Sequence, residues 1–277
     1  MSFHQVWVKF LFVNTKLYPS DLTEAQWEII KDLIPASPGL GRKRKVEMRW
    51  VVNAILYIVV GGVSWRMLPR EYPNWKSVYH YFRLFRLDGT WQRLHDTLRT
   101  RLRQKLGRHK HPTAGSLDSQ SVKTTGIGGE RGFDGGKQVK GRKRHILVDT
   151  LGLILALAVT SAQVSDPAGA RLLLSKWGGH CKKLRKIWVD GTYRGTLLDW
   201  AAQRFKAVIE PVLPKDDLKG FVLVPKRWVS ERTFSWLGQS RRLNKDYQRL
   251  TSSSETMIYL AMIYLAMTRL MVRRLVT

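Results

Sequence analysis

Apolar side chains recur every three or four residues through segment 20–106, which is the spacing of helices that bury one face. A capping-box signature, TEAQ at 23–26, opens the first of these runs. The run at 46–60 ends at a Gly-Gly pair and the run at 74–87 at Asp-Gly, and both pairs are typical helix stops. We therefore expect this part of the chain to be all-helical.

After residue 110 the pattern changes to short apolar runs separated by turn residues. A Gly-rich basic segment, 124–141, is typical of a loop. We expect single strands at 114–125, 186–190 and 207–212. Two further strands are expected within 145–162, joined by a hairpin turn at Asp149–Gly152. Helices are expected at 168–177, at 196–205 and from 226 onward. Three consecutive strands followed by alternation with helices predict a mixed sheet carrying helices, an α+β or mixed α/β fold.

These patterns divide the chain into three parts. Residues 1–19 are expected to be a disordered extension, 20–110 a helical domain, and 111–277 a sheet-containing domain that ends in a helix with an apolar stripe. That last helix is expected to cover the sheet, and it could also form a dimer contact.

The net charge of the chain indicates which class of partner it binds. The 277 residues include 48 Lys and Arg but only 21 Asp and Glu, giving a formal net charge of +27, and 44% of the residues are hydrophobic. A folded protein this basic favours DNA or RNA as its partner over a membrane surface. The single cysteine, Cys181, excludes an internal disulfide, and the apolar runs at 51–63 and 257–267 are interrupted or too short to cross a bilayer. We expect a cytoplasmic protein without a membrane contact.

Two acids occupy unusual places in this pattern. Asp118 lies inside the first predicted strand, and Asp190 ends the fourth, KIWVD. Those strands can be neighbours in a mixed sheet, and two carboxylates held close together repel unless a cation lies between them. A third oxygen ligand would complete a Mg²⁺ site, with Glu231 as the candidate and Glu210 as the competitor. An Asp before Gly is also typical of a turn or cap, and Glu231 could instead form a surface ion pair with Arg227.

Basic and polar side chains suggest contacts with a nucleic acid. The predicted helix at 74–87 carries four of them on one side: Lys76, Ser77, His80 and Arg83. A helix-turn-helix protein would lay such a helix in the major groove, although a solvated basic face has the same pattern. Three consecutive cations near the end of the basic loop are expected to meet phosphates: Arg142, Lys143 and Arg144. Asp149 is predicted to form the hairpin turn, and Asp134 and Asp166 are expected to be solvated or to cap helices.

Seven blocks stand out between about residues 17 and 272: LTEAQWEIIKDLIP, GVSWRMLP, PNWKSVYHYFRLF, LDSQSVKTT, KGRKRHILVDTLG, WVDGTYRG and VSERTFSWLGQSRRLNKDYQ. Together they resemble the insertion-sequence-5 family of bacterial DDE transposases. The resemblance implies a helix-turn-helix-like DNA-binding domain at 20–110 and a ribonuclease-H-like catalytic domain at 111–277.

The resemblance also implies roles for the acids. Asp118 in LDSQ, Asp190 in VDGTYRG and Glu231 in SERTFSWL match the three catalytic, metal-binding acids of the family. They would hold two Mg²⁺ ions, with Mn²⁺ able to replace them. The implied reaction is cleavage and strand transfer at the ends of an insertion sequence in double-stranded DNA. A homodimer or higher oligomer is expected, because two DNA ends must be brought together.

One part of the family pattern is incomplete. Related transposases carry the pattern Tyr-x2-Arg-x3-Glu-x6-Lys around the glutamate. In this sequence Arg227 matches the Arg of that pattern, but Val224 stands at the position of the Tyr and Gly238 at the position of the Lys. Arg241 or Arg242 could supply the missing cation and its DNA contact. Two other functions stay open, a catalytically inactive DNA-end-binding regulator or relic and a structure-specific nuclease of the same fold.

Overall fold

The computed structural model describes residues 18–37, 44–178, 183–213 and 226–271. Most of the predicted extension, together with Cys181 and Val224, lies outside these ranges. The described elements are α2 (Glu24–Ile30), η1 (Lys31–Leu33), α3 (Met48–Gly61), η2 (Trp65–Met67), α4 (Trp75–Leu87), α5 (Thr90–Lys105), β1 (Ala114–Lys123), β2 (Gly132–Asp134), β3 (Val139–Asp149), β4 (Ile154–Ser161), α6 (Asp166–Trp177), β5 (Lys186–Val189), α7 (Thr196–Phe205), β6 (Val208–Pro211), α8 (Trp228–Gly238), η3 (Arg241–Leu243) and α9 (Thr251–Met271).

The N-terminal helices begin and end where their sequence signals predict. The capping box of α2 is formed on both sides, because Gln26 N donates to Thr23 Oγ1 at 3.2 Å and Thr23 N donates to Gln26 Oε1 at 2.9 Å. Gly62 ends α3 in the left-handed conformation, with φ of +79°, which a residue without Cβ adopts at little cost. Asn74 caps α4 by accepting a hydrogen bond from Lys76 N.

The sheet is mixed, as the pattern predicts. Its strand order is β2-β3-β1-β5-β6, with β4 paired to β3. The pairs β1–β3, β2–β3 and β3–β4 are antiparallel, whereas β1–β5 and β5–β6 are parallel. The β3–β4 hairpin turns at the predicted place, where Asp149 Oδ1 accepts hydrogen bonds from the backbone of Leu151 and Leu153. The first and fourth predicted strands, β1 and β5, are therefore neighbours.

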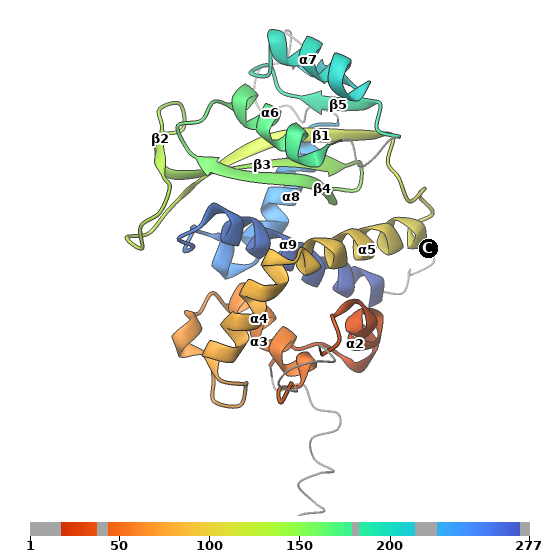
Figure 1. Ribbon diagram of the computed structural model, residues 1–277. Helices are drawn as coiled ribbons and strands as arrows, with labels where there is room; N and C mark the ends of the chain where they lie inside the picture. The colour runs from red at the N-terminus through yellow and green to blue at the C-terminus, as the bar shows by residue number, and fades with distance from the viewer. Residues whose placement is uncertain (1–17, 38–43, 179–182, 214–225, 272–277) are drawn as a thin grey trace, which may run out of the picture.

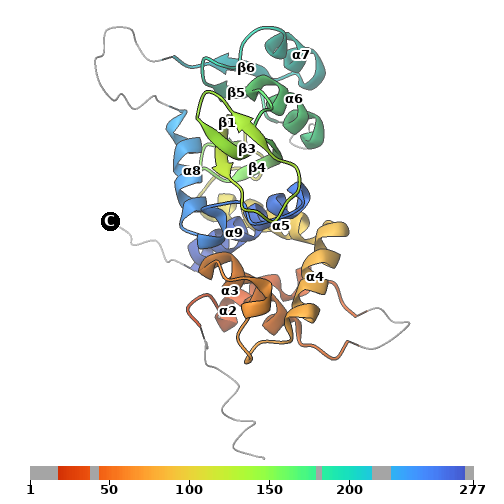
Figure 2. The same ribbon diagram turned by 90° about the vertical axis from the view of Figure 1, so that its left-hand side faces the viewer.

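The sheet lies between two layers of helices (Figures 1 and 2). Helices α6 and α7 cover one face and bury residues such as Leu117, Leu147 and Ile187. Helices α8, α9 and α5 lie on the other face, where one continuous core joins sheet residues such as Ile146 and Val148 to the N-terminal helices. The predicted covering role of the C-terminal helix is thus confirmed. The division of the chain near residue 110 stays a prediction, because this core extends across it.

Strand β3 begins at Val139, six residues before the predicted start. Every residue of β3 from Gly141 to Asp149 is buried, including the three cations expected to meet phosphates. A phosphate contact requires an accessible cation, so that interpretation of Arg142, Lys143 and Arg144 is corrected. No helix in the described ranges is both long enough and apolar enough to cross a membrane.

The buried cations of β3 have partners within the protein. The Arg142 side chain is 0% exposed and forms an ion pair with Asp246 at 3.2 Å, and it donates to the backbone oxygens of Gln248 and Arg249, both at 2.7 Å. Arg144 is 3% exposed, and its Nη1 lies 3.4 Å from Gln120 Oε1. Because solvation is lost, the pKa of Arg144 is lowered to about 10. Arg142 thus connects the sheet to the segment before α9, whereas the partner of Arg144 lies on the neighbouring strand β1.

Candidate active site

The parallel pairing of β1 with β5 brings Asp118 and Asp190 to the same level of the sheet. Ser116 pairs with Trp188, and each aspartate lies two residues further along its own strand direction. Side chains two residues apart on a strand share a face, so both carboxylates belong to the face covered by α8. The prediction that these two strands are neighbours is confirmed, and Asp190 lies close enough to Asp118 for its charge to act on that carboxyl.

Asp118 is partly buried in a setting that disfavours its charge. Burial raises the pKa of its carboxyl to about 6, and the nearby carboxylate of Asp190 adds to the rise. Three groups oppose this effect: Ser119 N donates to Oδ1 at 2.7 Å, Ser230 Oγ donates to Oδ2 at 3.2 Å, and Arg227 contributes its positive charge. A pair of acids held in this way favours a bound cation.

Asp190 sits in the turn that follows β5. Its Oδ1 accepts hydrogen bonds from Thr192 N, at 2.7 Å, and from Thr192 Oγ1. Asp190 therefore has the turn-forming role that was one of the two interpretations of its sequence position. Both of these hydrogen bonds are to Oδ1 and neither is to Oδ2. Tyr193, which follows in the same turn, is fully buried, and its pKa is raised well above the usual value by burial and by the charges of Asp118, Asp166 and Asp190.

Glu231 lies in the first turn of α8, and its side chain is exposed. The preceding residue, Ser230, is the one whose side chain contacts Asp118. Consecutive helical residues point about 100° apart, so the two side chains have different directions. Within the described ranges, no three His, Cys, Asp or Glu side chains are grouped closely enough to hold a metal ion. The structure thus brings Asp118 and Asp190 together. Glu231 is the residue after Ser230, which is the residue of α8 that contacts Asp118.

The competitor, Glu210, is engaged elsewhere. It pairs with Lys186 across the neighbouring strands β5 and β6, and this hydrogen bond lowers the pKa of its carboxyl. Ser230 and Tyr193 were missed by the sequence analysis, although both lie within the blocks that contain the predicted acids. Ser230 and Tyr193 lie near the two aspartates only because β1, β5 and α8 pack together, and no local sequence pattern reveals that packing.

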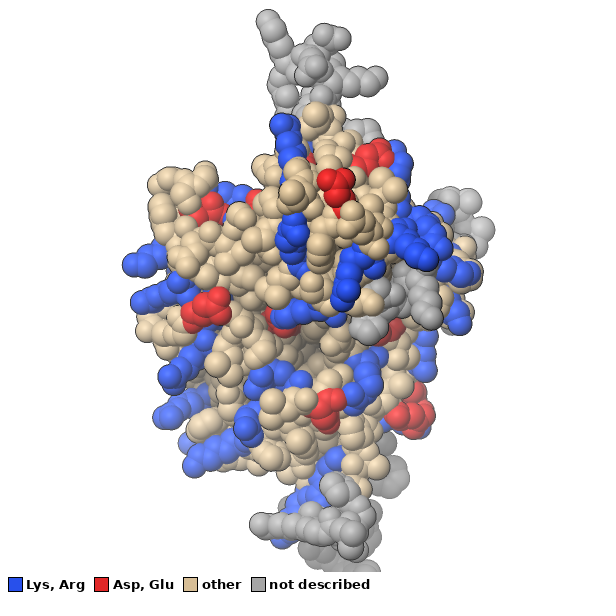
Figure 3. Space-filling view, turned by 45° about the horizontal axis from the view of Figure 1, so that its top comes forward, with Lys and Arg blue, Asp and Glu red and all other residues tan. Residues whose placement is uncertain are grey.

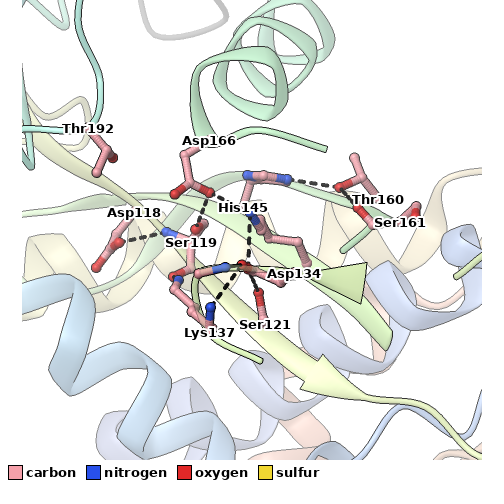
Figure 4. A network of polar contacts seen from close by, with 12 residues as sticks. Asp118, Ser119, Ser121, Asp134, Lys137, His145, Thr160, Ser161, Asp166 and Thr192 are labelled. Carbon is pink, nitrogen blue, oxygen red and sulfur yellow. Dashed lines mark hydrogen bonds and ion pairs between the residues drawn. The ribbon is translucent and has the colours of Figure 1, made fainter. Parts of the chain in front are cut away.

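A second polar network supports β1 from the opposite face of the sheet (Figure 4). Ser119 Oγ donates to Asp166 Oδ1 at 2.7 Å, and Ser121 Oγ donates to Asp134 Oδ2 at 2.5 Å. Buried Lys143 joins the two acids, with Nζ 3.1 Å from Asp166 and 3.3 Å from Asp134. This network fixes the side chains of Ser119 and Ser121, which follow Asp118 on β1.

Two expectations are corrected by this network. Asp134 is buried at the end of β2 rather than solvated in a loop. Burial opposes its charge, but the hydrogen bonds from Ser121 and the Lys137 backbone, together with Lys143, outweigh that effect and lower the pKa of Asp134 to about 2. Asp166 is the first residue of α6 and is held by Lys143.

The predicted DNA-contact residues of α4 lie on an accessible side of that helix. Lys76, His80 and Arg83 are exposed and Ser77 is partly exposed, while Val78, Phe82 and Phe85 form its buried side.

The basic residues around α8 differ in accessibility. Arg227 precedes α8 and is partly exposed, and Arg241 is exposed. Arg242 is buried, donates to Val63 O at 3.1 Å and lies over the Tyr247 ring. Arg242 therefore does not replace the missing cation at the surface, which corrects that part of the prediction.

Comparisons with known proteins agree with this geometry. A family model described as a transposase DDE domain matches residues 109–266, which include the sheet, both aspartates and Glu231. The chain belongs to the DDE transposase family. A second model, described as a transposase of the IS4/5 family, matches residues 22–95 of this transposase. The resemblance to the insertion-sequence-5 family is thereby confirmed at the level of the IS4/5 group.

A curated relative is also similar to this DDE transposase. It is the insertion element IS402 uncharacterized 16.2 kDa protein of Burkholderia cepacia, 30% identical over 114 residues. The match covers 38% of the present chain and 75% of the relative. The match supports the link to an insertion sequence.

DDE transposase domains generally depend on divalent metal ions, and two of the acids here fit such an ion. Asp118 and Asp190 have carboxylate oxygens on one face of the sheet that could bind a cation, and burial together with the charge of Asp190 raises the pKa of Asp118, an effect that a cation would offset. Ser230 Oγ is a further oxygen beside them.

In the absence of divalent metal, the transposase should gain stability relative to its Asp118→Asn variant as the pH falls from about 7.5 to about 5. The folded-state pKa of about 6 lies above the unfolded value of about 3.9, so the folded state binds more protons in this range. We expect a gain of about 1 kcal/mol in the free energy of unfolding over this pH range, measured by melting in EDTA at several pH values. Parallel pH profiles for the two proteins would contradict the environment described for Asp118.

Proposed function

We propose that this transposase cleaves double-stranded DNA at the ends of its own insertion sequence and transfers the freed strands, with Asp118, Asp190 and Glu231 as its catalytic acids. The observation that carries the proposal is the placement of Asp118 and Asp190 at one level of neighbouring parallel strands. The mixed sheet with helices on both faces supports a ribonuclease-H-like catalytic domain at 111–277. Helix α8 supports Glu231 as the third acid, because its Ser230 already contacts Asp118.

Asp118, Asp190 and Glu231 are the residues that would hold the metal, which we propose to be two Mg²⁺ ions that Mn²⁺ can replace. When bound, such ions activate the attacking water or 3′-OH and stabilise the leaving oxygen of a phosphodiester. The protein's own groups prepare this site. Thr192 orients the Asp190 carboxylate, and Ser119 N and Ser230 orient that of Asp118. Glu231 would join them through a rotation or shift of α8.

The helical region at 20–110 is proposed to be the helix-turn-helix-like part that binds the DNA ends, with α4 as its recognition helix. Its accessible side combines Lys76 and Arg83 with the polar groups of Ser77 and His80. Replacing His80 and Arg83 by Ala should weaken binding to the element's ends more than binding to unrelated DNA. Equal weakening for both DNAs in a gel-shift titration would assign these residues to nonspecific phosphate contacts.

The proposed activity is tested with a plasmid that carries the gene and its own flanking DNA. We expect cuts at the element boundary with Mg²⁺ and none with EDTA. Binding to those ends without cutting would favour an end-binding regulator, and equally fast cutting of unrelated DNA would favour a general nuclease. Pairing of two ends implies a homodimer or higher oligomer on DNA, and DNA as the partner implies a cytoplasmic, nucleoid-associated protein.

A further inference from the structure

A basic hollow lies at the end of β1 that is furthest from β5. It is an open depression of about 440 Å³ between the end of β1 and the β2–β3 hairpin, and its lining includes Lys123, Arg131, Phe133, Gln138 and Lys140. The loop that forms it is the Gly-rich basic segment of the sequence, which the proposed reaction leaves without a role. The hairpin extends from the side of the sheet (Figure 1).

The cations of this hollow are accessible and uncompensated. Lys123, Arg131 and Lys140 are all exposed, and within the described ranges none of them forms an ion pair with a carboxylate. The two acids of the same segment do not line the hollow: Glu130 Oε1 accepts a hydrogen bond from Ser161 N, and Asp134 is paired with Lys143. The hollow therefore carries positive charge that an anionic partner could offset.

An aromatic ring is placed among these cations. Phe133 is 52% exposed and pairs directly with Lys140 across β2 and β3. Exposed aromatic rings next to Lys and Arg are typical of surfaces that bind nucleic acids, because the ring packs on a base or sugar while the cations bind phosphates. Lys and Arg side chains are also spread over the face of the molecule seen in Figure 3, with Asp and Glu at scattered positions.

The hollow is held in a fixed shape by the buried Arg142. Arg142 Nε donates to Glu130 O at 2.7 Å, while its Nη atoms donate to the backbone of Gln248 and Arg249. Asp134 Oδ1 accepts hydrogen bonds from Gly136 N and Lys137 N, which fixes the turn between β2 and β3. A preformed arrangement of cations binds a partner without first paying the entropy of ordering a loop.

The hollow also has a defined position relative to the catalytic acids. Asp118 pairs with Ile146, and Lys140 lies six residues earlier on β3, so Lys140 belongs to the same face of the sheet as Asp118. Six strand residues correspond to about 20 Å, and one base pair of B-DNA to about 3.4 Å. A duplex that contacts both the acids and the hollow would thus have about six base pairs between the two contacts.

We infer that this hollow binds the DNA backbone about six base pairs from the scissile phosphate, with Lys123, Arg131 and Lys140 contacting phosphates and Phe133 packing against a sugar or base. The inference rests on the proposed function for the position of the DNA. The contact supplies affinity rather than sequence recognition, because phosphates carry no sequence information.

The test is the salt dependence of binding to a duplex made from the element's own end, measured in EDTA so that no cleavage occurs. The variant carries Lys123→Ala, Arg131→Ala and Lys140→Ala. A matched control with the same change of charge carries Arg108→Ala, Lys110→Ala and Arg204→Ala, all exposed and outside the hollow. Because all six side chains are exposed, both proteins should keep the wild-type melting temperature.

Loss of three phosphate contacts should reduce the magnitude of the slope of log K against log salt by about 2.7 in the hollow variant. Between 50 and 200 mM salt, the hollow variant should therefore lose affinity by a factor roughly 40-fold smaller than the wild type does. The control should keep the wild-type slope. A difference between the two triple variants of less than about 0.9, one contact, would overturn the inference. Failure of the wild type to cut its ends would instead reject the proposed function, and that result is separate from the slopes.

Discussion

The Asp190→Asn variant is expected to lose Mg²⁺-dependent cleavage of DNA carrying the element's ends by a factor of about 10³ or more, with DNA binding retained. Asparagine keeps the oxygen that accepts from Thr192 N, so the turn after β5 should persist. The substitution removes one of the two negative charges that would attract a divalent cation beside Asp118. The measurement is the rate of plasmid cleavage with Mg²⁺, accompanied by a gel-shift titration.

Asp199→Asn provides the matched control, because Asp199 is an exposed acid of the nearby helix α7. It makes the same chemical change outside the proposed site, so it should cleave at the wild-type rate. Cleavage by Asp190→Asn within tenfold of this control would remove Asp190 from the catalytic acids. Loss of binding together with cleavage would point to a damaged fold, which a melting curve would reveal.

The Arg142→Ala variant should lose about 3–5 kcal/mol of unfolding free energy. The substitution leaves the buried carboxylate of Asp246 without its cation and leaves the backbone oxygens of Glu130, Gln248 and Arg249 without their donor. Chemical denaturation monitored by tryptophan fluorescence would measure this loss.

Lys140→Ala is the control for that measurement, since Lys140 is an exposed cation two residues earlier on the same strand. Its unfolding free energy should lie within about 0.5 kcal/mol of the wild type. The Arg142→Ala change should also be far less damaging when combined with Asp246→Asn, because the buried charge is then removed. An Arg142→Ala protein as stable as the Lys140→Ala protein would contradict the buried role of Arg142.

Local sequence signals predicted much of the fold correctly. Thr23 and Gln26 form the capping box of α2, Gly62 ends α3, and Asp149 forms the turn between β3 and β4. Each signal acts through residues a few positions away, so it is visible in the sequence. The neighbouring positions of β1 and β5 followed from the order of strands and helices, and this order placed Asp118 beside Asp190.

The errors arose where distant segments decide the environment of a residue. KGRKRH has the composition of an exposed basic loop, yet it lies inside β3 because Asp246, Asp134 and Asp166 supply its charge partners. These acids are separated from the strand by loops and helices, and no spacing rule links them to it. The contact of Ser230 with Asp118 joins residues 112 positions apart and was missed for the same reason.

The most direct test of the catalytic proposal compares cleavage by Glu231→Gln and Glu210→Gln on a plasmid carrying the gene's own flanking DNA, with Mg²⁺ and with EDTA. Glu231 lies next to the residue that contacts Asp118, whereas Glu210 is paired with Lys186. If Asp118, Asp190 and Glu231 form the catalytic site, the wild type and Glu210→Gln will cut at the element boundary only with Mg²⁺, and Glu231→Gln will bind the ends without cutting. Mg²⁺-dependent cutting by Glu231→Gln at the wild-type rate would contradict the proposed site.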